Sequence, residues 1–246
     1  MRRAHLAVLP LTLTLIAGCG TEEQPAAIAP PTSSAPTAPA APATPVPTPN
    51  GVENLTAARI LAAATKASIS APSVRIRGTI QDADGAMAID MRISQQAATG
   101  AVKIAGLGKM TLVRVGADAY FSADRQFLSV ANPGAVAQAG KYVKLDGRPG
   151  PFADFRSLTL MREAFTDLLK PEGGRLTKGR PAAIGGVPVI GLVDGTKGTL
   201  YVATQGEPRA LRMIDSRTKS RLDFIYDVPV QAQLPSPGDI VTPQGG

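Results

Sequence analysis

The sequence predicts an α+β fold: a curled antiparallel half-barrel sheet with two or three helices packed on its apolar face. Three observations support this prediction. Most segments between residues 74 and 226 alternate apolar and polar side chains, which is typical of strands with one buried face. Turn residues recur about every eight to twelve positions, as expected for consecutive antiparallel strands. Two segments with helical periodicity are too short to cover the whole apolar face of such a sheet.

The first residues are typical of a signal for export. Two arginines precede an apolar run over residues 6–16, which is the layout of a secretory signal peptide. A membrane-spanning helix would need about 20 apolar residues. The run ends in Leu15-Ile16-Ala17-Gly18-Cys19, which resembles the bacterial lipobox, where the cysteine thiol accepts diacylglycerol and the chain is cut before it. We therefore expect a lipoprotein signal peptide over 1–18. We also expect Cys19 to be acylated, with palmitate among the attached acyl chains.

An ordinary secretory signal, with the cysteine there by chance, is the alternative interpretation. Cys19 is the sole cysteine of the 246 residues, so it has no disulfide partner within the chain. Lipidation accounts for this single thiol in an exported protein. Two or three acyl chains would anchor the protein stably, at about 0.8 kcal/mol per buried methylene group. The expected location is the outer, extracytoplasmic face of the cell membrane.

Residues 19–51 predict a disordered tether that begins at the lipidated cysteine. Pro, Ala, Thr and Ser dominate this stretch, which has no aromatic side chain. It cannot bury enough apolar surface to offset the entropy of ordering. In an extended conformation of about 3.1 Å per residue, the tether would reach roughly 90 Å. One domain of common size then occupies 52–237, and a disordered tail is expected over 238–246.

The composition excludes several classes of function. The sole histidine, His5, lies in the signal, so the mature chain has neither imidazole nor a free thiol. Ser-His-Asp triads, Cys-His pairs and zinc sites built on His or Cys are thereby excluded, and we expect no enzyme, metal or cofactor. Nucleic acid is disfavoured as a partner by export and by the absence of tryptophan. The net charge of +7 suits an anionic membrane surface or glycolipid better.

The elements of the first half follow from these patterns. A helix is expected over 54–66, with Asn54 as its N-cap, and Pro72 prevents its continuation. Residues 124–140 form a connection that is partly helical. Strands are expected at 74–80, 86–93, 99–105, 109–116, 118–122 and 141–145.

The second half begins with the clearest helix of the chain, over 158–169. Its apolar residues form one stripe, and Pro171 ends it. After Pro229 the chain loses all periodicity. Strands are expected at 181–184, 187–194, 197–204, 208–215 and 219–226.

Apolar side chains on the inward face of these elements form the candidate binding surface. A long curled sheet encloses more apolar surface than two helices can fill, so we expect a cavity between them. Several members are methionines, which adapt to varied apolar ligands but also serve as ordinary core residues. The candidate cavity residues are Val74, Ile76, Ile80, Met87, Ile89, Met91, Ile93, Val102, Ile104, Leu112, Phe121, Met161, Phe165, Leu168, Leu200, Val202, Leu211, Met213, Leu222 and Phe224.

Several motifs resemble a known lipoprotein family. Besides the lipobox and the tether, they are Ala62-Ala-Ala-Thr-Lys66-Ala, Val74-Arg-Ile-Arg-Gly-Thr79, Gly198-Thr-Leu-Tyr-Val-Ala-Thr204 and Pro208-Arg-Ala-Leu-Arg212. Together they resemble the actinobacterial LppX/LprA/LprF/LprG lipoproteins over most of residues 52–230. The resemblance implies a LolA/LolB-like half-barrel whose apolar cavity holds acyl chains. It also implies a role in carrying lipids or lipoglycans through the cell envelope.

Two functions from different classes follow from these observations. The first is a lipid carrier, whose cavity binds the acyl chains of a lipid or lipoglycan without chemistry. The second is a non-catalytic anchored scaffold or sensor, whose core is filled and which binds another envelope protein. A continuous cavity of several hundred Å³ would distinguish the first from the second.

Overall fold

The computed structural model describes residues 48–82, 85–145, 154–172, 174–215 and 217–242. All of them belong to one compact unit, Pro45–Gly246. The expected signal peptide, Cys19, most of the expected tether and residues 243–246 of the expected tail lie outside the described residues. The described part of the chain contains no helix with the length and apolar character needed to cross a membrane.

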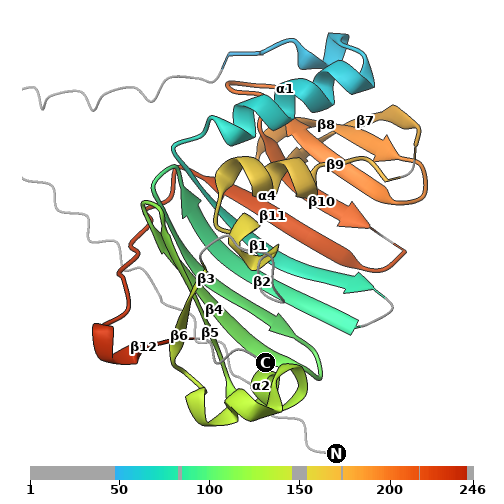
Figure 1. The fold of residues 1–246 in the computed structure, drawn as a ribbon. Helices are drawn as coiled ribbons and strands as arrows, with labels where there is room; N and C mark the ends of the chain where they lie inside the picture. Colours follow the sequence, from blue (N-terminus) through green and yellow to red (C-terminus); the bar gives the residue numbers. More distant parts are fainter. Residues whose placement is uncertain (1–47, 83–84, 146–153, 173, 216, 243–246) are drawn as a thin grey trace, which may run out of the picture. The chain divides into compact units, whose positions relative to one another are not determined.

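A single unclosed sheet of twelve strands forms the body of this unit (Figure 1). Its spatial order is β12-β6-β5-β4-β3-β2-β1-β11-β10-β9-β8-β7. The strands are β1 (Ser73–Asp82), β2 (Gly85–Ser94), β3 (Ala97–Ile104), β4 (Gly108–Val115), β5 (Asp118–Ala123), β6 (Tyr142–Leu145), β7 (Leu176–Ile184), β8 (Val187–Asp194), β9 (Gly198–Ala203), β10 (Ala210–Asp215), β11 (Ser220–Tyr226) and β12 (Ile240–Val241).

The two halves of the sheet meet at β1. This strand pairs with β2 on one side and with β11 on the other, so residues far apart in sequence become neighbours. Gly78 lies at this junction with φ +150°, and a Cβ there would collide with the backbone of Arg221. Glycine is therefore required for β1 and β11 to approach closely at this point.

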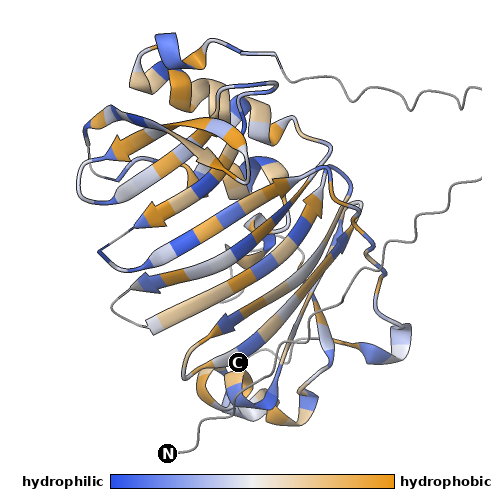
Figure 2. Cartoon of the chain, turned by 180° about the vertical axis from the view of Figure 1, so that it is seen from behind, coloured by the Kyte–Doolittle hydropathy of each residue, from blue (hydrophilic) through white to orange (hydrophobic). Residues whose placement is uncertain are grey.

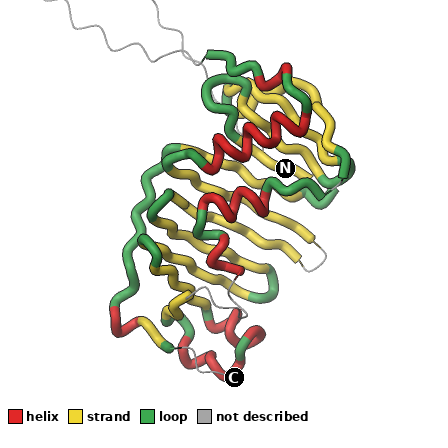
Figure 3. Tube along the Cα trace, turned by 45° about the horizontal axis from the view of Figure 1, so that its top comes forward, coloured by secondary structure: helices red, strands yellow, loops and turns green. Residues whose placement is uncertain are grey.

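The principal helices lie on one face of the sheet, as Figure 3 shows for the two segments that cross it. Both α1 (Ala57–Ile69) and α4 (Met161–Leu168) pack there, and they contact each other. The remaining helical segments are η1 (Val52–Asn54), α2 (Arg125–Ala131), η2 (Pro133–Gln138), α3 (Asp154–Ser157) and η3 (Pro237–Asp239). The curled α+β half-barrel predicted from the sequence is thus confirmed.

The start of α1 differs from the prediction of Asn54 as N-cap. Residues Val52–Asn54 form a separate 3-10 turn, and the helix begins at Ala57. The cap is Thr56, whose Oγ1 accepts a hydrogen bond from the backbone N–H of Arg59 at 3.4 Å. A threonine hydroxyl serves this purpose almost as well as an asparagine side chain, and Asn54 cannot be the cap because it belongs to the preceding 3-10 turn.

Two strands lie outside their predicted limits. β7 begins at Leu176, five residues before the predicted start. The prediction missed these residues because a bulge between Lys178 and Pro181 interrupts the alternation of apolar and polar side chains. Beyond the predicted domain end at 237, β12 pairs with β6 in parallel. An ion pair of 2.7 Å between Lys141 and Asp239 accompanies this pairing. The chain therefore continues as ordered structure into the predicted tail.

A buried polar contact fastens α1 to the sheet. Ser68 of α1 is fully buried, and its hydroxyl accepts hydrogen bonds from the Tyr226 hydroxyl at 2.8 Å and from the Ala210 backbone N–H at 3.1 Å. Burial raises the pKa of Tyr226, so its phenol stays protonated and can donate. The contact joins the C-terminal turn of α1 to β10 and β11 and satisfies each buried polar group.

Hydrophilic and hydrophobic residues alternate along many of the strands (Figure 2), and several of the hydrophilic ones form ion pairs. Asp90 lies opposite Arg77 in register, but its carboxylate accepts two hydrogen bonds, of 2.7 and 2.6 Å, from Arg75 one step along the strand. Asp223 similarly binds both Arg212 and Arg221. The Arg75–Asp90 and Arg212–Asp223 pairs cross neighbouring strands, whereas Arg221 lies on the same strand as Asp223. Such pairs are typical of a solvated sheet face.

The Arg75–Asp90 pair predicts an acid-dependent part of the stability. The hydrogen bonds from Arg75 hold the pKa of Asp90 below its ordinary value. The contact therefore stabilises the fold above about pH 4 and is lost as the pH falls through the folded-state pKa. Between about pH 6 and pH 3, we expect the urea midpoint of the wild type to fall further than that of Asp90→Asn. Glu207→Gln, an exposed control, should behave like the wild type; equal losses in all three would refute this assignment.

Candidate functional site

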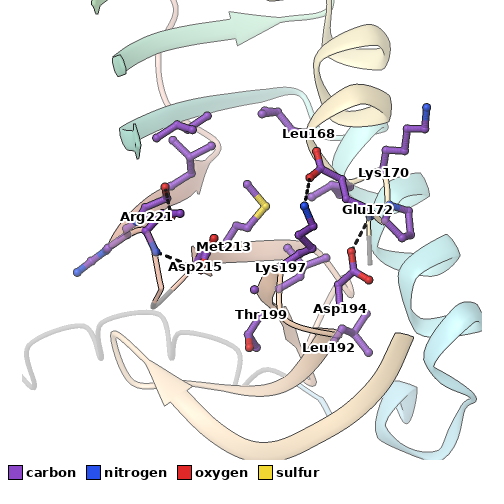
Figure 4. A pocket seen from close by; sticks show the side chains of 18 of the residues that line it. Leu168, Lys170, Glu172, Leu192, Asp194, Lys197, Thr199, Met213, Asp215 and Arg221 are labelled. Atoms are coloured by element: carbon purple, nitrogen blue, oxygen red, sulfur yellow. Dashed lines mark hydrogen bonds and ion pairs between the residues drawn. The ribbon is translucent and has the colours of Figure 1, made fainter. Parts of the chain in front are cut away.

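A cavity of about 550 Å³ lies between the C-terminal end of α4 and the ends of β1 and β8–β11 (Figure 4). Its floor is apolar because alternate residues of the strands face the helices. The apolar lining consists of Leu61, Ile80, Leu168, Leu169, Leu176, Leu192, Leu200, Met213 and Leu222.

Four of these residues form one row across four strands. Leu192 of β8 lies opposite Leu200 of β9, and Leu200 lies opposite Met213 of β10. Met213 in turn lies opposite Leu222 of β11. We call Leu192, Leu200, Met213 and Leu222 the apolar row. Residues in one register row share a face of the sheet, so the apolar row forms a continuous hydrophobic surface beneath the end of α4.

Charged side chains surround the opening of the cavity, as Figure 4 shows. They include Glu172, Asp194, Lys197, Asp215 and Arg217, which we call the charged rim. The Asp194 carboxylate accepts a 2.6 Å hydrogen bond from the Glu172 backbone N–H, and the Lys197 ammonium lies 3.9 Å from the Glu172 carboxylate.

Asp215 of the rim accepts several hydrogen bonds. Its burial opposes ionisation, but hydrogen bonds from the backbone and side chains of Arg217 and Thr218 outweigh this and lower its pKa. The backbone N–H of Arg217 donates to it at 2.9 Å. Asp215 is therefore ionised at neutral pH, whereas the floor of the cavity is apolar. This arrangement fits an amphiphile with an apolar chain inside and a polar group at the opening.

The predicted site residues divide into three groups. Five of them line the cavity: Ile80, Leu168, Leu200, Met213 and Leu222. Fourteen others belong to the packed core under α1, α3 and α4 or lie against it, and they do not line this cavity. These are Val74, Ile76, Met87, Ile89, Met91, Ile93, Val102, Ile104, Leu112, Phe121, Met161, Phe165, Val202 and Phe224. Within the described part of the chain, this cavity thus involves one end of the predicted apolar face, and the other predicted residues pack in or against the core cluster.

Leu211 is the one predicted cavity residue that does not join the core cluster. A bulge between Ala210 and Arg212 interrupts the alternation of β10. Ala210, which is fully buried, takes the inward position instead. A β-bulge adds one residue to the strand and changes which side chains point inward, so Leu211 neither joins the core cluster nor lines this cavity.

Sequence reasoning missed four apolar residues of the cavity. Leu192 lies on a predicted strand, and the alternation of that strand could have identified it. Leu61 lies on α1. No local sequence pattern indicates that α1 contacts the end of α4. Leu169 and Leu176 flank the connection from α4 to β7, outside the predicted strand.

A buried arginine positions the start of α4. Arg114 of β4 is 3% exposed, and four backbone carbonyls accept its hydrogen bonds, the longest being that to Gln95 at 3.5 Å. Its Nε donates to Thr159, its Nη1 to Gly116 and its Nη2 to Ser94, each at 2.9 Å. Burial, together with nearby Arg156, lowers the pKa of Arg114, but a guanidinium stays charged in proteins. The side chain thus joins the turn before α4 to two hairpin turns of the sheet.

The acidic side chains do not converge on a metal site. Within the described ranges, no group of three or more His, Cys, Asp or Glu residues is close enough to hold a metal ion. The described residues of the site provide an apolar floor and the charged side chains of the rim.

Fold and site together define a class of protein: an α+β half-barrel with an apolar cavity under a charged rim. Comparison of the sequence with protein-family models and with curated proteins gives no match. Among solved structures, the chain is similar to LprF from Mycobacterium bovis, with 15% identity and a TM-score of 0.46, over 77% of this chain and 99% of that one.

Two further solved structures are similar to the chain. The lipoprotein LppX from Mycobacterium tuberculosis has 12% identity and a TM-score of 0.38, over 72% of this chain and 99% of that one. The MucA/MucB complex from Pseudomonas aeruginosa has 11% identity and a TM-score of 0.34, over 68% of this chain and 55% of that one. LprF and LppX are both members of the family that the sequence motifs resemble.

Proposed function

We propose that the protein is a membrane-anchored lipoprotein that binds an acyl chain of a lipid or lipoglycan in the cavity and carries or presents it within the cell envelope. The observation that carries this proposal is the apolar row, which floors a cavity opening at a charged rim. A cavity filled by core side chains would have suited a scaffold better. The volume of about 550 Å³ lies within the roughly 300–1,000 Å³ that is usual for small-molecule sites.

The anchor is part of the same proposal. Residues 1–18 would be removed, Cys19 would carry the lipid, and 19–51 would form the tether to the domain at 52–237. Pro49 bridges Gln205 just after β9, and the Asn50 backbone N–H donates to Thr204 at 2.9 Å. The cavity is lined by the first residues of β9 instead. An anchored chain would thus join the domain at the end of β9 opposite the cavity, leaving the opening accessible to a lipid or to another envelope protein.

Lipid extraction of the full-length protein, purified from its own membrane, tests this function. We expect native mass spectrometry to detect a non-covalently bound lipid in addition to the covalent anchor. Met213→Trp would fill the cavity from the apolar row, and we expect bound lipid to fall by about tenfold, equivalent to about 1.4 kcal/mol.

Ile225→Trp is the matched control for this experiment. Ile225 lies on β11, is 41% exposed and does not line the cavity. The variant Ile225→Trp places the same large side chain on the strand next to β10, so the lipid content of this variant should equal that of the wild type. No bound lipid in the wild type, or equal amounts in Met213→Trp and Ile225→Trp, would overturn the proposal.

A further inference from the structure

A surface groove runs along the two helices beside the cavity. It has a volume of about 950 Å³ and is lined by α1, by α4 and by the connection after α4. Ala58 and Ala62 lie on the α1 side, and both are exposed. Small side chains at successive turns of a helix leave the space above them open. The groove is therefore wide enough for a polar group of some size and is accessible from solvent.

Three basic side chains line the groove: Lys66 of α1, Arg162 of α4 and Lys170 just after α4. The only acidic residue in the lining is Asp167. Within the described part of the chain, none of the three basic side chains makes an ion pair or a side-chain hydrogen bond. Arg75, Arg212 and Arg221 on the outer face of the sheet are, by contrast, each paired with a carboxylate. The groove thus presents an uncompensated positive charge.

The groove and the cavity share a wall. Leu61, Asp167, Leu169, Lys170 and Pro171 line both spaces. The two spaces therefore lie side by side at the end of α4. The headgroup of a lipid whose chain lies on the apolar row has only these shared residues between it and the basic side chains.

We propose that the groove binds the anionic headgroup, phosphate-bearing or carboxylate-bearing, of the same lipid whose chain occupies the cavity. The inference rests on the proposed function and adds the substrate class: the cargo is an anionic lipid. Two features support this assignment: the positive charge of the groove complements an anionic headgroup, and the groove adjoins the cavity. A headgroup without net charge would gain little from Lys66, Arg162 and Lys170, whereas a headgroup with a net negative charge would pair with them.

Binding of chain-matched lipids tests the proposal on the full-length protein. The probes are phosphatidylglycerol, phosphatidylcholine and diacylglycerol with identical chains, delivered from vesicles at fixed ionic strength. We expect the wild type to bind phosphatidylglycerol about tenfold more tightly than phosphatidylcholine. The variant Lys66→Glu/Arg162→Glu should lose this preference and keep its affinity for diacylglycerol. The conservative variant Lys66→Arg/Arg162→Lys should retain the preference.

A charge-matched control separates the groove from the net charge. Arg59 and Arg180 are exposed and line neither space. Arg59→Glu/Arg180→Glu therefore makes the same change in net charge and should leave the preference for phosphatidylglycerol unchanged. A loss of preference in this control as great as in the groove variant would overturn the proposal, because long-range attraction alone would then explain it.

The remaining outcomes distinguish this inference from the proposed function. Equal binding of all three lipids by the wild type would overturn the anionic headgroup alone, and binding of none would overturn both. Inorganic phosphate provides the last test. Binding of free phosphate, abolished in the groove variant and unaffected by bound lipid, would identify the groove as a free-phosphate site and refute a lipid headgroup there.

Discussion

Replacement of Phe165 by alanine is expected to lower the free energy of unfolding by about 3–5 kcal/mol. Phe165 of α4 is fully buried, and its ring lies 5.4 Å from that of Phe224 and 6.2 Å from that of Tyr226, measured between centroids. The truncation removes the apolar contact and leaves a void between α4 and β11. Because these rings hold α4 over the sheet, the change should also loosen the helix that borders the cavity.

Urea unfolding followed by circular dichroism measures this loss. Glu163→Ala on the same helix is the control, because Glu163 is exposed and the change should stay within about 0.5 kcal/mol. A loss below about 1 kcal/mol for Phe165→Ala would show that the surrounding residues collapse into the void. That result would contradict the assignment of Phe165 as the side chain that secures α4.

Replacement of Arg114 by leucine is expected to cost about 3 kcal/mol or more. The carbonyls of Thr159, Gly116 and Ser94 would each lose a charged donor, and an unsatisfied buried acceptor costs roughly 1–3 kcal/mol. Only part of this cost is recovered where water can reach the two hairpin turns. The carbonyl of Thr159 precedes α4 directly, so we expect the loss to reach the cavity through the position of that helix.

Hydrogen exchange and urea unfolding together test this role. Amides of α4 should exchange faster in Arg114→Leu than in the wild type under conditions where both are folded. Arg59→Leu, an exposed arginine outside these contacts, should change neither exchange nor stability appreciably. Unchanged exchange in α4, whatever the loss of stability, would show that Arg114 stabilises the hairpin turns without positioning the helix.

The fold was predictable because most of its strands alternate apolar and polar side chains. Met87, Met91 and Ile93 alternate with polar residues on β2, and they lie on the buried face as expected. Helix α4 was predictable from its apolar stripe, although it begins at Met161 and not at the predicted residue 158. The pattern failed where a local irregularity shifts the period, at Leu211 beside the bulge of β10 and at the start of β7. It also failed for β12, because two residues that pair in parallel with a distant strand have no period at all.

By itself, the sequence determined the α+β class, the inward face of most strands and the absence of histidine and cysteine chemistry after residue 19. These are properties of composition and local periodicity. Only the tertiary structure decided which part of that apolar face stays open. Phe121 and Phe224 pack under the helices, whereas Leu200 and Met213 face a cavity, although all four lie on strands and point inward. The difference arises because the end of α4, at Leu168 and Leu169, borders the cavity, and no local pattern reports over which strands that end of the helix lies.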